Sequence, residues 1–253
     1  MAISHREFKD RLYAQFARIG KALGSPHRIE MLELLAQGER TVDSLATEIG
    51  LSIANASQHL QALRQASLVE SRKDGLFVYY RLGDPTVSDL GFAVRAVAER
   101  RLAELEQLVH AHFGDRSRPE PVKMEELLER ARSPEVIILD ARPASEYQAA
   151  HIVGSISVPI DELQNRLRSL PKDKEYVAYC RGPYCVYADR AVEMLLKSRR
   201  RARRLMGGLP EWRSAGFPVN SGEARTTGAA PTPRARPGQN RTRRPAVLAG
   251  GNT

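Results

Sequence analysis

The stretch 176–185 reads Tyr-Val-Ala-Tyr-Cys-Arg-Gly-Pro-Tyr-Cys and contains both cysteines of the chain. Its first four residues form an apolar run typical of a buried strand, and the residues from Ala188 to Leu196 follow a helical pattern. Cys180 therefore lies at a strand-to-helix turn, where the unpaired N–H groups of the helix favour an anion. We expect this turn to lower the pKa of Cys180, and we predict that Cys180 is a nucleophile.

The loop between the two cysteines supports the same chemistry. Gly182 and Pro183 permit a tight turn whose amides point inward, and Arg181 supplies a cation for an anionic sulfur donor. Cys180 and Cys185 can also act as a catalytic pair. The alternatives are an inert buried cysteine with a spare one, and a zinc site, which would lack its second pair of ligands nearby.

Three ordered motifs over about residues 120–220 resemble the rhodanese family. The first runs from Val136 to Pro143 and continues through Glu146-Tyr147 and the stretch 151–156. The second is the cysteine loop, and the third covers 207–212 and 215–219. The resemblance implies an α/β domain with a parallel sheet, in which Cys180 carries a persulfide between a sulfane-sulfur donor and a thiol acceptor.

The same resemblance gives supporting roles in the site to Asp140, Arg142, His151 and Gly182. Without the family, Asp140 is interpreted as a cap at a strand end, Arg142 as its ion-pair partner and His151 as a core histidine. The related phosphatases and arsenate reductases use a Cys-x5-Arg motif, but Val186 stands where that arginine would be. Sulfur transfer is therefore favoured over phosphoryl chemistry.

Charge is unevenly distributed along the chain, whose formal net charge is +9. Residues 1–113 carry no net charge, and the excess comes from an arginine-rich run at 198–204 and from the end of the chain. The run is typical of a solvated surface, or attracts anionic donors or DNA if it lies near the site. Residues 221–253 have no apolar period and are predicted to form a disordered basic tail.

The composition also indicates the compartment. No run approaches the length of a membrane span, and no apolar signal segment stands at the N-terminus. Two cysteines in one loop fit a reducing compartment better than a secreted disulfide framework. We expect a cytoplasmic protein without membrane contact.

The N-terminal third has a different pattern. Apolar residues at helical spacing predict a first helix from Phe8 to Leu23, a second that begins at Ser25-Pro26, and a short third capped by Asp43. Gly50 turns the chain and Ser52 caps a fourth helix, whose buried stripe is predicted to be Ile53, Ala56, Leu60 and Leu63. The stretch 68–81, with an Asp-Gly turn, predicts a hairpin. Together these elements predict a mainly α winged helix-turn-helix domain.

Residues from about 8 to 110 resemble the ArsR family of repressors. The resemblance rests on Leu23–Ile29, on Ser57-Gln58-His59-Leu60-Gln61-Ala62-Leu63 in the fourth helix, and on Leu68-Val69 and 79–82. One departure is Ser67, where the family usually turns with glycine, and we expect it to reduce stability. The predicted contacts to double-stranded DNA come from the polar faces of the fourth helix and the hairpin. They are Ser52, Asn55, Ser57, Gln58, His59, Gln61, Arg64, Arg72 and Lys73. The alternative is a winged helix used only for protein contacts.

Apolar residues from Val87 to Val109 predict one long amphipathic helix, too long for a small domain to cover. We expect a homodimer that places two recognition helices on a palindromic operator. ArsR proteins often bind metals, but residues 1–179 contain no cysteine, and the rings of His110 and His112 face different sides of a helix. We therefore predict no metal site and no cofactor.

The predicted organisation is a DNA-binding and dimerisation domain at 1–113, a linker at 114–121, a rhodanese-like domain at 122–220 and the tail. Two functions remain open at this point. In the first, the chain is a transcription regulator whose Cys180 senses reactive sulfur species. In the second, it is a thiosulfate or polysulfide sulfurtransferase whose DNA-binding domain anchors it or regulates its own expression.

Overall fold

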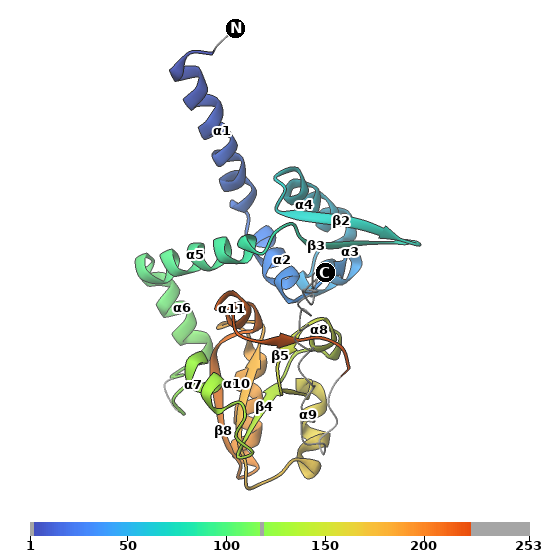
Figure 1. Ribbon diagram of the computed structural model, residues 1–253, viewed down its shortest axis with the longest axis vertical. Helices are drawn as coiled ribbons and strands as arrows, with labels where there is room; N and C mark the ends of the chain where they lie inside the picture. The colour runs from blue at the N-terminus through green and yellow to red at the C-terminus, as the bar shows by residue number, and fades with distance from the viewer. Residues whose placement is uncertain (1–2, 117–118, 224–253) are drawn as a thin grey trace, which may run out of the picture.

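The computed structural model describes residues 3–116 and 119–223, which form two domains stacked along the long axis of the molecule (Figure 1). The predicted tail begins at residue 221, and its part from residue 224 onward lies outside the described residues. The N-terminal domain is a winged helix-turn-helix and the C-terminal domain is an α/β unit with a parallel sheet, as the sequence predicted.

The N-terminal domain has six helices and a small antiparallel sheet. The helices are α1 His5–Leu23, α2 Pro26–Gln37, α3 Val42–Ile49, α4 Ile53–Gln65, α5 Thr86–Arg101 and α6 Ala103–Phe113. The strands are β1 Arg40–Thr41, β2 Val69–Asp74 and β3 Phe77–Leu82, in the order β1-β3-β2. Strands β2 and β3 form the wing. Its turn is Gly75-Leu76, one residue later than the Asp-Gly turn predicted, because Asp74 still pairs with Phe77.

Helices α3 and α4 form the helix-turn-helix. Ser52 caps α4 by accepting from the Asn55 amide, and Gly50 ends α3 at a φ of 74°. The prediction that Asp43 caps α3 is wrong, because Thr41 accepts from the Ser44 amide instead. Asp43 lies in the first turn, where its carboxylate interacts with the positive end of the helix dipole.

The buried stripe of α4 is shorter than predicted. Ala56, Leu60 and Leu63 are fully buried in the core between α2, α3 and the wing. Ile53 is 57% exposed, so its predicted burial is wrong. Residues 52–55 are all exposed, which means that the first turn of α4 projects beyond the core and carries an apolar side chain into solvent.

The long helix predicted from Val87 to Val109 is broken. Leu102 has an extended backbone, with φ −111° and ψ 100°, and it separates α5 from α6. Helix α6 turns away from α5 and runs toward the C-terminal domain (Figure 1). Its last residue, Phe113, lies under the guanidinium of Arg116, 4.1 Å from the ring centre. The break therefore directs α6 to the other domain.

The C-terminal domain is built on a parallel sheet in the order β6-β4-β7-β8. Its strands are β4 Val136–Asp140, β6 Ile156–Ser157, β7 Glu175–Cys180 and β8 Arg201–Gly208, and β5 His151–Ile152 pairs with β9 Val219–Asn220. The helices are α7 Met124–Arg130, α8 Ala144–Ala149, α9 Ile160–Arg166, α10 Val186–Lys197 and α11 Leu209–Ser214, with a 3-10 turn at Leu167–Ser169. Helices α9 and α10 pack on one face of the sheet, and α7 and α11 pack on the other.

Within residues 3–116 and 119–223, two non-glycine residues adopt left-handed backbone conformations. Ser67, between α4 and the wing, has a φ of 60°, and Arg199, between α10 and β8, has a φ of 59°. A side chain makes this conformation about 1–2 kcal/mol less favourable than it is for glycine. Ser67, which stands where the ArsR family usually turns with glycine, thus has a backbone conformation that favours glycine.

Candidate functional site

The cysteine loop joins the end of β7 to the start of α10, at the carboxyl edge of the parallel sheet. Cys180 is the last residue of β7 and is 1% exposed, and Cys185 is the N-cap residue of α10. Strand β8 passes close behind the loop, because a Cβ added to Gly208 would lie 2.5 Å from the Cys180 carbonyl oxygen. The loop backbone therefore has no room to move toward β8.

The pKa values of the two thiols differ from the prediction. Burial raises the pKa of Cys180 well above its ordinary value, and the neighbouring Cys185 raises it further. The backbone amides of Ala188 and Gly182 act in the opposite direction but do not outweigh burial. The thiol of Cys180 lowers the pKa of Cys185 to about 7. The prediction of a lowered pKa for Cys180 is wrong, because Cys185 has the lower pKa of the pair.

Arg181 does not face an open anion site as predicted. Its guanidinium donates to Glu146 on α8, with an Nη2–Oε1 distance of 2.6 Å, and also to Glu48 on α3. Burial alone would lower the pKa of Arg181, but the two carboxylates hold it above its ordinary value. The charge of Arg181 is therefore balanced by carboxylates, and one of them belongs to the N-terminal domain.

The arginine run is largely used within the domain. Arg200 is buried and donates to the carbonyl oxygens of Leu167 and Leu170, while Arg203 pairs with Glu126 and Glu175. These contacts satisfy backbone carbonyls and carboxylates beside the sheet.

Arg204 is the cation of this run that lies beside the cysteine loop. Its Nε is 3.7 Å from Asp189 on α10, and within the described residues this atom has no hydrogen-bond partner. Burial and the nearby Arg116 lower its pKa, whereas Asp189 and Cys180 raise it. Arg204 is thus within electrostatic range of the Cys180 sulfur, which makes it a candidate for anion binding that the run alone could not single out.

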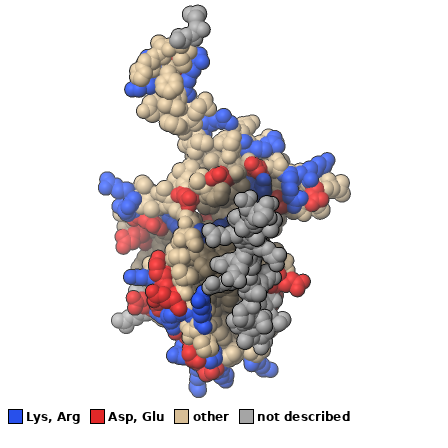
Figure 2. Space-filling model, viewed as in Figure 1, with Lys and Arg blue, Asp and Glu red and all other residues tan. Residues whose placement is uncertain are grey.

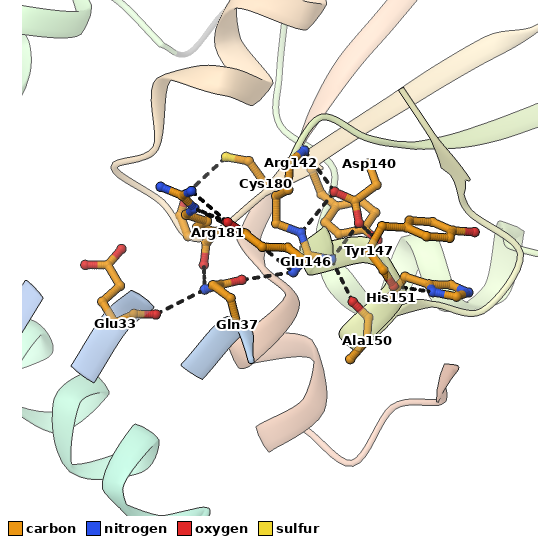
Figure 3. A network of polar contacts seen from close by, with 12 residues as sticks. Glu33, Gln37, Asp140, Arg142, Glu146, Tyr147, Ala150, His151, Cys180 and Arg181 are labelled. Carbon is orange, nitrogen blue, oxygen red and sulfur yellow. Dashed lines mark hydrogen bonds and ion pairs between the residues drawn. The ribbon is translucent and has the colours of Figure 1, made fainter. Parts of the chain in front are cut away.

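A buried polar network connects the sheet edge to the N-terminal domain (Figure 3). Asp140 accepts two hydrogen bonds from the Arg142 guanidinium, at 2.9 and 2.6 Å, and one from the Tyr179 hydroxyl. Arg142 also donates to the side-chain oxygen of Gln37, over 3.0 Å. Burial alone would lower the pKa of Arg142, but the Asp140 carboxylate holds it above its ordinary value.

Gln37, the last residue of α2, is the point where this network meets the cysteine loop. Its side-chain nitrogen donates to the backbone carbonyl of Arg181 over 3.0 Å, and the whole residue is buried. Beside it, a Cβ added to Gly38 would lie 2.9 Å from that of Ala149. The end of α2 is therefore in direct contact with both the loop and α8.

His151 lies on β5, stacked on the Tyr147 ring with the ring centres 3.7 Å apart. Its Nδ1 is 2.8 Å from the Tyr147 carbonyl oxygen. Gly182, at the outer side of the loop, faces the carboxylates of Glu33 and Glu211, 3.5 and 3.7 Å from the position of an added Cβ. Of the predicted site residues, Cys180, Arg181, Gly182 and Cys185 thus belong to the loop, Asp140 and Arg142 belong to the network beside it, and His151 contacts Tyr147.

Further polar contacts hold the domains together around the loop. Arg95 on α5 pairs with Glu211 over 2.7 Å, and the Tyr184 hydroxyl donates to Glu99 over 2.6 Å. Burial raises the pKa of Tyr184 to about 12, and Glu99 raises it as well. A cavity of about 320 Å³ lies beside these contacts, lined by Arg181, Tyr184 and apolar side chains of α2 and α5.

The predicted DNA-reading face is open to solvent. Seven of the nine predicted side chains are exposed, and Ser57 and His59 are half-buried. The exposed ones are Ser52, Asn55, Gln58, Gln61, Arg64, Arg72 and Lys73. Figure 2 shows Lys and Arg side chains along α1 and on the wing, with acidic side chains among them.

Two arginines near this face are held by protein groups. Arg72 binds the Glu39 carboxylate, with Nη2 2.6 Å from Oε2, and also binds Asp74. Arg28 donates to the carbonyl oxygens of Ala22 and Lys21 at the end of α1. Arg28 therefore caps a helix, whereas Arg72 reaches DNA only at the cost of its pairing with Glu39.

Comparison with known proteins gives one match in each domain. Residues 25–71 match the bacterial regulatory protein arsR family, and residues 123–215 match the rhodanese-like domain. A Mycobacterium tuberculosis protein, "HTH-type transcriptional regulator Rv0324", is 44% identical over 214 residues, which cover 85% of this chain and 94% of that protein.

Other relatives match the N-terminal domain. The "Probable mercury resistance operon repressor" of Streptomyces lividans is 36% identical over 36% of this chain and 72% of its own length. The solution structure of the homodimeric DNA-binding domain of a possible ArsR-family regulator from Mycobacterium bovis is 42% identical. It covers 41% of this chain and 94% of that one, with a TM-score of 0.37.

Within 3–116 and 119–223, no three His, Cys, Asp or Glu side chains lie where they could together hold a metal ion. None of the helices in these ranges is both long and apolar enough to span a bilayer. The winged helix-turn-helix, the rhodanese-like domain and the full-length relative together show that this chain belongs to the ArsR family of transcriptional regulators and carries a rhodanese domain behind its DNA-binding domain.

Proposed function

We propose that this regulator binds a palindromic operator as a homodimer and carries sulfur as a persulfide on Cys180, so that its affinity for the operator reports reactive sulfur species. The observation that carries the proposal is the ion pair between Arg181, next to Cys180, and Glu48 on the first helix of the helix-turn-helix. A sulfur-carrying loop built into the contact with a DNA-binding domain is placed to influence that domain.

Sulfur loading follows from the two thiols. Cys185, with its pKa near 7, accepts the proton of Cys180 as the Cys180 sulfur attacks the outer sulfur of thiosulfate. The sulfur–sulfur bond of thiosulfate breaks and sulfite leaves with the bonding electron pair. The products are the Cys180 persulfide anion, the Cys185 thiol and sulfite. A thiol or cyanide then removes the outer sulfur and regenerates Cys180.

A second step gives the loop a lasting change of shape. The Cys185 thiol passes its proton to the outer sulfur of the Cys180 persulfide, and its own sulfur attacks the inner sulfur. Hydrosulfide leaves with the electron pair of the broken sulfur–sulfur bond. A Cys180–Cys185 disulfide forms without any further oxidant. Both cysteines are free in this structure, and the N-cap position of Cys185 allows its side chain to turn toward Cys180.

The DNA side of the proposal rests on the exposed polar face of α4 and on the wing. The dimer rests on apolar side chains that α1 and α5 leave uncovered. Phe16 is 60% exposed, Tyr13 59% and Val97 54%, and α1 projects away from the rest of the chain (Figure 1). A second copy that covers these side chains would remove several large apolar groups from water.

One preparation of the full chain tests the proposal. Intact-mass measurement after thiosulfate or polysulfide treatment should show a sulfur adduct on the wild type and none on Cys180→Ser. The affinity for a duplex selected from a random pool should then differ between the treated and untreated wild type. An adduct with unchanged affinity would favour the sulfurtransferase whose DNA-binding domain is only an anchor, and the absence of any adduct would contradict both functions.

A further inference from the structure

The cysteine loop is completed by residues of the DNA-binding domain, and this gives those residues a role beyond DNA binding. Gln37 and Glu48 contact Arg181 from helices α2 and α3, at its backbone carbonyl and at its guanidinium. We propose that Gln37 is a positioning residue of the sulfur-transfer loop and transmits the state of Cys180 to the DNA-reading surface. The inference rests on the proposed function, and it adds the path by which a change at Cys180 reaches the DNA-reading surface.

The first step is steric. Cys180 is almost fully buried, and its sulfur lies 3.4 Å from the Cys185 carbonyl oxygen and 3.7 Å from that of Gly182. A second sulfur atom on Cys180, or a bond to Cys185, does not fit without movement of this loop. The loop cannot move toward β8, because the Gly208 backbone is already in contact with the Cys180 and Arg181 backbones. On another side, the loop is in contact with the DNA-binding domain through Gln37 and Glu48, so a displaced loop acts on these two residues.

The second step passes through Gln37. Its side-chain nitrogen donates to the Arg181 carbonyl oxygen, and its side-chain oxygen accepts from the Arg142 guanidinium. Arg142 is in turn held by its ion pair with Asp140. Loss of a partner for a buried polar group is strongly unfavourable. A shift of the Arg181 peptide therefore either moves Gln37 with it or leaves buried groups without partners. In both cases the contacts at the C-terminal end of α2 change.

The third step reaches the DNA-binding face. Glu39, two residues after Gln37, binds the guanidinium of Arg72 on the wing. Arg40, the next residue, pairs with Glu146 and begins the strand that pairs with β3 of the wing. In parallel, Glu48 joins Arg181 to α3, which packs against α4. A displacement at Gln37 thus alters the residues that hold Arg72 and the wing.

Gln37→Ala and Glu48→Gln test the route in the full chain. Glu48 is partly exposed, so its neutral variant keeps the fold even if the buried Gln37 variant does not. The matched controls are Gln164→Ala and Glu30→Gln, which change exposed residues of α9 and α2. The first readout is the affinity for the selected duplex before and after polysulfide treatment. We expect a change of about 5–150-fold in the wild type and both controls, and a smaller change in each test variant, because each variant removes one of the two contacts to Arg181.

The second readout does not need sulfur loading. Because the contacts through Gln37 and Glu48 join the DNA-binding domain to the loop that contains Cys185, duplex DNA should change the rate at which iodoacetamide alkylates Cys185 in the wild type, and should change it less in each test variant. Test variants that keep the wild-type response in both readouts overturn the inference. A wild type that takes up no sulfur, yet shows the DNA-dependent alkylation, contradicts the proposed function and leaves the route through Gln37 supported. A wild type whose alkylation is insensitive to DNA overturns the route.

Discussion

The guanidinium of Arg116 donates to the carbonyl oxygen of Pro183 over 2.6 Å, so the segment between the two domains is fastened to the cysteine loop. The same guanidinium binds Asp189 on α10 over 2.6 Å and lies over the ring of Phe113 at the end of α6. The sequence predicts a linker here, and its described part is a structural component of the site.

Arg116→Ala should therefore loosen the cysteine loop. Charge-assisted hydrogen bonds of this kind contribute about 1.5–3 kcal/mol, so we expect amide hydrogen exchange at residues 182–187 to be about tenfold faster or more. Hydrogen exchange followed by mass spectrometry measures this rate. Arg132→Ala, which changes an exposed arginine after α7, is the control. Equal exchange in the two variants would show that Arg116 does not hold the loop.

The thiol pair predicts a pH dependence. The pKa of Cys185 is lowered to about 7, so its thiolate is present above pH 7 and is lost as the pH falls below it. The alkylation rate of Cys185 should rise with pH through a midpoint near 7. Cys180→Ala removes the thiol that stabilises this thiolate, and the midpoint should move up toward the ordinary cysteine value of about 8.5. A midpoint that stays near 7 would assign the lowered pKa to the helix terminus alone.

Arg204 should assist the capture of anionic sulfur donors. Its guanidinium lies within electrostatic range of Cys180, and its Nε is free of hydrogen-bond partners among the described residues. We expect Arg204→Leu to slow sulfur loading from thiosulfate about tenfold, which corresponds to about 1.4 kcal/mol. Arg201→Leu, at the exposed start of the same strand, should have little effect. Similar rates in both variants would exclude a role for Arg204 in donor capture.

The recognition helix and the wing should contribute differently to DNA binding. Gln58→Ala removes a side chain suited to a base edge, and we expect it to weaken binding to the selected duplex by about 1–3 kcal/mol. Lys73→Ala removes a phosphate contact, so it should weaken binding to all duplexes alike and reduce the dependence of affinity on salt. Titrations of selected and random duplexes at several salt concentrations separate the two effects. If Lys73→Ala changes sequence preference instead, the wing reads bases.

Ser67 should limit the stability of the N-terminal domain. Its φ of 60° disfavours a residue with a Cβ, so Ser67→Gly should raise the free energy of unfolding by about 1 kcal/mol. Ser67→Ala keeps the Cβ and is the matched control, for which we expect no gain. Urea denaturation of both variants measures the difference. Equal stability of the two variants would mean that the Ser67 conformation is not strained.

Local sequence patterns predicted most of the architecture. The Ser25-Pro26 start, Gly50 and Ser52 mark helix ends through local hydrogen bonds and backbone conformation, and the structure has helix ends at these positions. The same reasoning missed the break at Leu102, because the apolar period continues through it. It also placed Ile53 in the core, since periodicity does not show where a core ends.

The site was harder to predict because its properties arise between distant segments. The pKa of Cys180 is governed by burial and by Cys185, while the helix start, which the sequence does show, contributes the smaller effect. Gln37 and Glu48 have no distinguishing pattern, since a polar residue at the end of a short helix is typical of a surface. Their role follows only from the contact between the two domains. Neither the pattern of residues 1–113 nor that of residues 122–220 indicates where this contact lies.

The contact between Gly38 and Ala149 has a consequence for how such a fusion can be assembled. The two positions approach so closely that a side chain on residue 38 would meet the Ala149 methyl group, and the neighbouring Gln37 requires Arg142 and the Arg181 carbonyl as partners. A rhodanese domain from another protein, grafted behind this DNA-binding domain, would reproduce the order of the domains without their junction. The two halves of this chain are thus a matched pair, and exchange of either half would have to be accompanied by changes in the other.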